Sequence, residues 1–251
     1  MSRKSTTPEV VVVETEKAEL NKPLLVLGFA GAGLVGGIAV IHIVNQLKMK
    51  KIAHIRCRYL PPAAVFVDGI LRHPMRIYAG MKGKLCAVVS EISLPSDSAF
   101  PLAQALLNWA DEKEINEVII LEGIPVKKLP EKRQSFCVAE PEKIEECVDK
   151  GVKMLSAGFI GGIAGSILNE CLTRKIVGLA FLTPTIAFLP DPEGAASLVQ
   201  ALNKVYDLKI GTTELLKEAS EIKEKLREIA ERHRKMREAE EKRGVPERMY
   251  V

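Results

Sequence analysis

The last three residues of the chain, Met249, Tyr250 and Val251, are of the types that a protein pocket can capture. A hydrophobic side chain and an aromatic ring can pack, the phenol hydroxyl can hydrogen-bond, and a terminal carboxylate can meet a lysine or backbone N–H groups. Gly244 and Pro246 separate these residues from a long charged segment. The alternative is an ordinary frayed terminus, as most chain ends are. The three residues alone do not choose between a docking tail and a frayed end.

A glycine-rich sequence, Gly31-Ala-Gly33-Leu-Val-Gly36, could bind phosphate, because it is a formal G-x-G-x-x-G between an expected strand and an expected helix. Backbone N–H groups in such a turn can hold a pyrophosphate. The following strand, however, ends in Arg56 and Arg58, which would suit a 2′-phosphate, and offers no acidic residue for a ribose hydroxyl. This favours the alternative that the glycines let a helix and a strand pack closely.

Two polar sequences follow expected core strands, which is where ligands bind in α/β proteins. One runs from Ser90 to Ser98 and is rich in hydroxyl and carboxylate side chains, and the other is Glu122-Gly-Ile-Pro125. Either could contribute to a small-molecule site. Serine and aspartate at such junctions also cap helices, and that ordinary role is the alternative.

Other catalytic and metal-binding patterns do not occur in the sequence. It contains no G-x-x-x-x-G-K-[ST], no G-x-S-x-G and no H-E-x-x-H. The four histidines lack a metal-ligand spacing, and His42, on an apolar helix, is interpreted as a packed core residue. The five cysteines are scattered and form no C-x-x-C, so we expect reduced thiols in the cytoplasm. These absences exclude a P-loop ATPase and leave no regular metal site, and we assign no catalytic residue, metal ligand or cofactor.

Alternating strands and helices must position these residues. We expect strands at 10–13, 24–28, 52–58, 64–67, 75–79, 85–91, 118–121 and 176–181, and helices at 34–47, 100–114, 140–150, 160–172 and 194–206. This alternation predicts an α/β fold, with a layered core around a largely parallel sheet. The core domain is expected to span residues 9–212 and to follow a disordered N-terminus at 1–8.

The next segment, 213–243, is predicted to be a long helix that forms a coiled coil. Apolar residues recur there at alternating steps of four and three, with Glu, Lys and Arg between them, which is typical of an a/d seam. The seam residues are Leu215, Ala219, Ile222, Leu226, Ile229, His233 and Met236. The seam could pair with a neighbouring subunit or lie on its own domain, and the spacing does not choose. Residues 244–251 would then form a flexible tail.

Composition limits the partners. The 36 basic and 32 acidic residues nearly balance, and aromatic residues make up only 5% of the chain, so we expect no nucleic-acid surface. The segment 24–44 is apolar and long enough to span a membrane. Its central glycines instead divide it into a strand and a helix, so we expect no membrane partner either.

Several local sequences resemble, in their order and spacing, the archaeal branch of the proteasome assembly chaperone family. They are Leu27-Gly-Phe-Ala-Gly-Ala-Gly-Leu-Val-Gly36, Leu121-Glu-Gly-Ile-Pro125, Gly158-Phe-Ile-Gly-Gly-Ile-Ala-Gly165, and Thr183-Pro184 followed by Pro190-Asp-Pro-Glu-Gly-Ala-Ala196. The resemblance implies a core like that of purine nucleoside phosphorylases, without established catalysis, and therefore a protein that is not an enzyme. It also implies a homo-oligomer, with a tetramer favoured, that acts as an ATP-independent chaperone of the proteasome core particle.

The same resemblance implies a role for the C-terminus. Proteins that dock on the core particle often end in a hydrophobic residue, a tyrosine and any third residue, and this end enters pockets between adjacent α subunits. Met249, Tyr250 and Val251 match that pattern and are therefore assigned to partner binding. The alternative function is a nucleotide- or nucleoside-binding protein or enzyme that uses Gly31–Gly36 and Ser90–Ser98.

Overall fold

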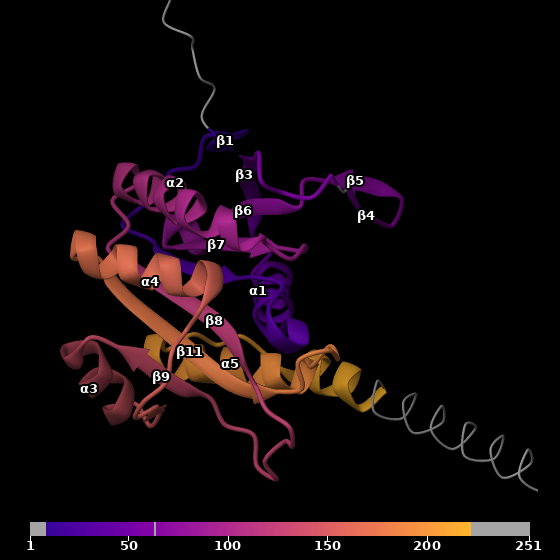
Figure 1. The fold of residues 1–251 in the computed structure, drawn as a ribbon, viewed down its shortest axis with the longest axis vertical. Coiled ribbons are helices and arrows are strands. Elements are labelled where there is room, and N and C mark those ends of the chain that lie inside the picture. Colours follow the sequence, from indigo (N-terminus) through magenta and orange to yellow (C-terminus); the bar gives the residue numbers. More distant parts are fainter. Residues whose placement is uncertain (1–8, 63, 222–251) are drawn as a thin grey trace, which may run out of the picture.

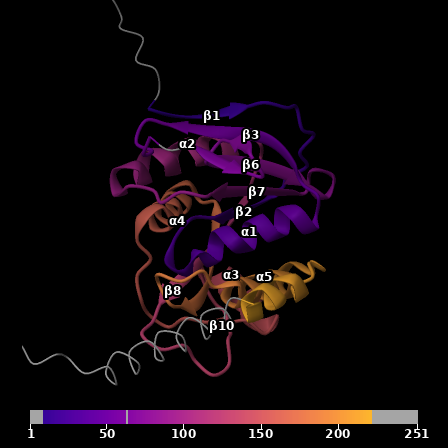
Figure 2. The same cartoon turned by 90° about the vertical axis from the view of Figure 1, so that its right-hand side faces the viewer.

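The computed structural model describes residues 9–62 and 64–221, which fold around one mixed β-sheet (Figures 1 and 2). Its nine strands are β1 (Val10–Glu14), β2 (Leu24–Gly28), β3 (Lys50–Cys57), β6 (Met75–Gly80), β7 (Leu85–Ser90), β8 (Glu117–Pro125), β9 (Phe136–Ala139), β10 (Lys153–Met154) and β11 (Val177–Thr185). They are arranged in the order β1-β3-β6-β7-β2-β8-β11-β9-β10.

The centre of the sheet is parallel, as the alternation of strands and helices predicts. Strand β2 pairs in parallel with β7 and β8, and β8 pairs in parallel with β11. The β1-β3-β6-β7 side and the β11–β9 pair are antiparallel. Strands β6 and β7 must be antiparallel, because the connection through the 3-10 turn at Met81–Gly83 is too short for a parallel crossover.

Helices cover both faces of this sheet (Figure 2). Helices α2 (Ala99–Glu112) and α4 (Gly162–Arg174) pack on one face, and α1 (Val35–Gln46), α3 (Pro141–Asp149) and α5 (Pro192–Tyr206) pack on the other. The central strands supply both apolar cores, because successive side chains point to opposite faces. In β2, for example, Leu25 and Leu27 belong to the first core and Val26 belongs to the second. This explains why these strands are continuous apolar runs in the sequence.

A short hairpin projects from the body of the molecule beside β3 and β6 (Figure 1). It consists of β4 (Val65–Val67) and β5 (Ile70–Arg72), joined by an Asp-Gly turn in which both residues have positive φ. The side chains of Phe66, Ile70 and Leu71 are 70%, 62% and 75% exposed. The sequence predicted a strand at 64–67, but it did not predict β5, β9 or β10.

The start of the predicted coiled coil packs on its own domain. Residues 213–221 are helical, and both seam residues in this stretch, Leu215 and Ala219, are buried. Leu215 joins the apolar core that α1 and α5 share, and His42 of α1 hydrogen-bonds through Nε2 to the Gly211 carbonyl oxygen at 2.6 Å. The spacing did not decide whether the seam pairs with a neighbouring subunit or lies on its own domain. Leu215 and Ala219 lie on their own domain. The described residues therefore show no coiled coil.

The other predicted seam residues and the tail lie outside the described residues; these are Ile222, Leu226, Ile229, His233, Met236, Met249, Tyr250 and Val251. Within the described residues, the apolar segment 24–44 is divided between β2 and α1, as expected. Over the same part of the chain, no helix combines the length and the apolar character needed to cross a membrane.

Candidate functional site

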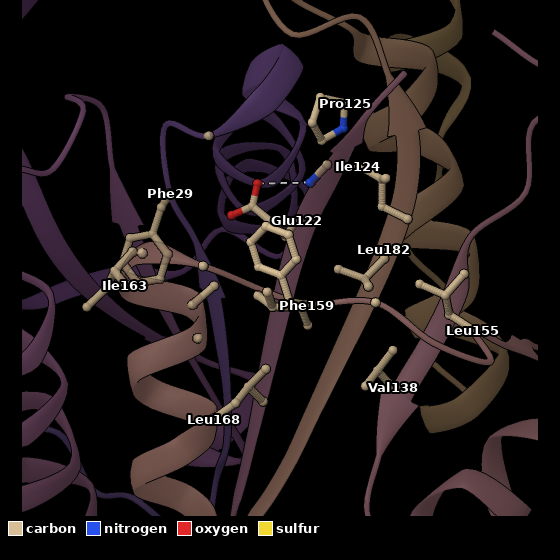
Figure 3. A pocket seen from close by; sticks show the side chains of 18 of the residues that line it. Phe29, Glu122, Ile124, Pro125, Val138, Leu155, Phe159, Ile163, Leu168 and Leu182 are labelled. Atoms are coloured by element: carbon tan, nitrogen blue, oxygen red, sulfur yellow. Dashed lines mark hydrogen bonds between the residues drawn. The ribbon is translucent and has the colours of Figure 1, made fainter. Parts of the chain in front are cut away.

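The carboxyl ends of β2, β8 and β11 border a cavity of about 1020 Å³ (Figure 3). Most of the side chains that line it are apolar. They come from elements far apart in the sequence and include Phe29 after β2, Ile124 in β8, Val138 in β9, Leu168 in α4 and Leu182 in β11. The topology thus gathers an apolar pocket at the edge of the sheet where α/β proteins place their ligand sites.

Glu122, in β8, brings an acidic group into this apolar wall (Figure 3). Among the described residues that line the cavity, it alone carries a charge. Its Oε1 accepts a hydrogen bond from the Gly123 N–H at 2.9 Å. Burial raises the pKa of Glu122 to about 7, although the Gly123 N–H acts in the opposite direction. At neutral pH the carboxyl group is therefore divided between its protonated and ionised forms.

The first glycine of the G-x-G-x-x-G sequence makes room for this carboxyl group. A Cβ atom on Gly31 would lie 2.3 Å from Oε1 of Glu122, which is far closer than a van der Waals contact. The glycine loop and the sequence Glu122-Gly-Ile-Pro125, which the sequence presents as two separate candidates, therefore meet in one place.

Three N–H groups of the glycine loop are already used within the protein. The amides of Gly31, Gly33 and Leu34 donate to the carbonyl oxygens of Phe29, Ala187 and Gly31, at 2.9, 3.0 and 3.1 Å. Cβ atoms on Gly33 and Gly36 would lie 2.1 Å from Thr185 Oγ1 and from the Leu121 carbonyl oxygen. The structure thus favours the interpretation that these glycines serve close packing.

The two arginines that could have bound a 2′-phosphate lie elsewhere. Arg56 is in β3, which β6 and β7 separate from β2, and Arg58 follows β3 and forms an exposed pair with Glu9. Neither is among the residues that line the cavity.

The polar side chains between Ser90 and Ser98 mostly serve the local structure. Ser90 Oγ donates to the Ile92 carbonyl oxygen at 2.8 Å, and Ser98 Oγ donates to the Pro95 carbonyl oxygen at 2.6 Å. The Glu91 carboxylate accepts a 2.7 Å hydrogen bond from the buried Arg76 guanidinium. From this segment only Leu94 lines the cavity, so its hydroxyl and carboxylate groups do not form the site.

One wall of the cavity was not identified from the sequence. The loop from Leu155 to Gly161 lines it before α4 begins at Gly162, and Phe159 in this loop is 94% exposed. Three glycines, at 158, 161 and 162, could have indicated this loop, because glycine favours a loop over a helix. The sequence predicted a helix from residue 160 instead.

The raised pKa of Glu122 predicts how stability changes with pH. The folded state holds the Glu122 proton up to a pH of about 7, whereas the unfolded state releases it near the ordinary value of 4.5. The free energy of unfolding therefore falls as the pH rises from 4.5 to 7. Glu122→Gln should therefore raise the free energy of unfolding by about 3 kcal/mol at pH 8.5 and leave it unchanged at pH 4. Urea unfolding at both pH values measures this. Glu145→Gln, at an exposed position of α3, is the matched control; equal effects of the two changes at pH 8.5 would contradict the prediction.

Comparison with known proteins identifies the family of this fold. The model of the PAC2 family matches residues 25–230. The chain belongs to the PAC2 family. An uncharacterized protein of Methanocaldococcus jannaschii, MJ0106, is 30% identical over 215 residues, which are 86% of this chain and 88% of that protein.

Two solved structures from Pyrococcus furiosus share the PAC2 architecture of this chain. PbaA, described as an archaeal homolog of proteasome-assembly chaperone, has a TM-score of 0.83 and 28% identity over 94% of this chain and 97% of its own. PbaB, described as an archaeal proteasome activator, has a TM-score of 0.81 and 24% identity over 89% and 100%. The order and spacing of the sequence motifs predict a protein that resembles PbaB most within the family. The comparisons support the family, but they do not single out PbaB.

Proposed function

We propose that this PAC2 chain is a proteasome assembly chaperone or activator that binds the core particle without using ATP. The observation that carries the proposal is its likeness to PbaA over nearly the full length of both chains. In the proposed mechanism, Met249, Tyr250 and Val251 enter the pockets between adjacent α subunits of the core particle, in the cytoplasm. In this proposal the core supplies no catalytic step, and its task is to assemble and to present these tails.

The proposal includes a homo-oligomer, with a tetramer favoured. The β4–β5 hairpin supports self-association, because it carries the exposed side chains of Phe66, Ile70 and Leu71 away from the body of the domain. Apolar groups gathered in this way are typical of a surface that another protein covers. In the proposed assembly, seam residues from Ile222 onwards pair between subunits, whereas Leu215 and Ala219 stay on their own domain.

An oligomer would suit a weak docking sequence. A three-residue anchor binds weakly by itself, but several anchors on one assembly raise each other's effective concentration. Affinity for a ring of pockets would therefore depend on the number of tails as well as on each contact.

Replacement of the tyrosine tests the proposal. Tyr250→Ala should lower the affinity for the core particle by about thirtyfold or more, because buried aromatic anchors dominate such contacts. His233→Leu is the control, since it changes the predicted seam and leaves the tail intact. Binding can be measured with purified archaeal core particle on a sensor surface. Failure of the unmodified chain to bind would overturn the proposed function, and equal binding by Tyr250→Ala would overturn the role of the tail.

A further inference from the structure

We propose that the cavity bordered by β2, β8 and β11 binds a small molecule that combines an apolar body with a protonated amine. The site is separate from the C-terminal tail, and this inference does not depend on proteasome binding. It depends on the size of the cavity, on its apolar wall and on the position of Glu122.

The cavity is large enough for a complete ligand. Its volume of about 1020 Å³ is at the upper end of the range for pockets that bury drug-sized molecules. Side chains such as Phe29, Ile163 and Leu182 would bury the apolar part of the ligand (Figure 3). Asn169 and Ser156 also line the cavity and could orient polar edges of the ligand.

The amine follows from the Glu122 carboxyl group, which lines the cavity and has one oxygen free to accept a hydrogen bond. Its Oε1 already accepts the Gly123 N–H at 2.9 Å, whereas Oε2 has no hydrogen-bond or ion-pair partner among the described residues. A carboxylate in apolar surroundings is costly unless a cation or several donors accompany it. No basic side chain among the described lining residues supplies that cation. A ligand ammonium group would supply it through a charge-assisted hydrogen bond.

The rim of the cavity offers a second feature that suits a cation. The Phe159 ring is 94% exposed and belongs to the loop that lines the cavity. Aromatic faces attract ammonium groups through their quadrupole. The negative carboxyl group and the nearby aromatic rings therefore both favour a positively charged ligand group.

The same chemistry argues against an anionic ligand such as a nucleotide. A phosphate in this cavity would meet Glu122 and no basic side chain among the described lining residues. The amides of Gly31, Gly33 and Leu34 already donate to carbonyl oxygens. Ionisation of Glu122 is also linked to the binding of a cation. A bound ammonium group should lower the pKa of Glu122 from its value of about 7 in the free protein, so binding below pH 7 should release protons.

Three probes of matched shape test the proposal on the full chain. They are 4-phenylbutylamine, 4-phenylbutanol and 4-phenylbutyrate, whose affinities can be measured by ligand-observed NMR up to millimolar concentrations. At pH 8 the amine should bind about tenfold more tightly than the alcohol, because a hydrogen bond between charged groups adds that much. The acid should bind most weakly. The affinity for the amine should rise as the pH increases from 6 to 8, because the carboxyl group loses its proton over this range.

Variants assign the effect to one carboxyl group. Glu122→Gln keeps the shape of the side chain and should bind amine and alcohol equally, without dependence on pH. Glu145→Gln removes the same charge from an exposed position of α3 and should keep the preference for the amine. An amine that binds no more tightly than the alcohol to the unmodified chain would overturn the proposal. So would a pH-independent affinity, an unchanged preference in Glu122→Gln, or the absence of saturable binding by all three probes.

Discussion

Removal of Met249, Tyr250 and Val251 is expected to abolish binding of the proteasome core particle while the oligomeric state of the chain stays unchanged. The shortened chain would end at Arg248, so both the aromatic anchor and the correctly placed carboxylate would be lost. Every subunit of the assembly would lose its anchor at once, and the gain from several linked anchors would disappear with them. Affinity should therefore fall by about a hundredfold or more. Binding to immobilised core particle measures this, and light scattering after gel filtration measures the oligomer.

A conservative change at the same end provides the control. The pattern that assigns this role accepts any residue in the final position, so Val251→Ala should bind with nearly unchanged affinity. Wild-type binding by the shortened chain would contradict the tail mechanism. Loss of binding together with loss of the oligomer would instead place the tail in subunit assembly. The family assignment stands in both cases, because the PAC2 match covers residues 25–230 and does not include the tail.

The sequence predicts the central part of the fold well, because its signals there are local. The segment 24–44 combines a short apolar run, a glycine turn and a longer apolar run, and these become β2, the turn and α1. The short strands β9 and β10 carry much weaker signals. Strand β10 has two exposed residues, Lys153 and Met154, whose strand conformation comes from pairing with β9. Pairing with a distant strand leaves little trace in a two-residue sequence.

The candidate site was harder to predict, because its residues converge only through the order of the strands. Phe29, Glu122 and Leu168 lie far apart in the sequence and line one cavity because β2 and β8 are neighbours and α4 covers their face. The sequence showed that glycines at 31–36 and an acid at 122 follow core strands. It did not show that the Glu122 carboxyl group occupies the space that a side chain at position 31 would need. That relation depends on a contact between the loop after β2 and strand β8.

Close packing of the glycine loop leads to the second large expected effect, which concerns Gly36. Gly36→Ala should lower the free energy of unfolding by about 3 kcal/mol or more, because overpacking at a rigid contact is costly. The new Cβ atom would lie 2.1 Å from the Leu121 carbonyl oxygen in β8. That oxygen is backbone of a central strand paired on both sides, with β2 and with β11, so it cannot move aside without disturbing the sheet. Such a loss is a large share of the stability of an ordinary domain.

The neighbouring glycine of the same helix separates this steric effect from the general effect of changing glycine to alanine. A Cβ atom on Gly37 would lie 3.6 Å from its nearest neighbour, the Phe29 carbonyl oxygen, which is an ordinary contact. Alanine also favours helix over glycine by about 1 kcal/mol, so Gly37→Ala should leave stability unchanged or raise it. Urea unfolding of both variants measures the midpoint and the slope. Similar midpoints for the two variants would contradict the packing role of Gly36. A loss confined to Gly36→Ala would show that the third glycine of the G-x-G-x-x-G sequence holds α1 against β8, because a Cβ atom on Gly36, unlike one on Gly37, would meet the backbone of a strand that cannot move.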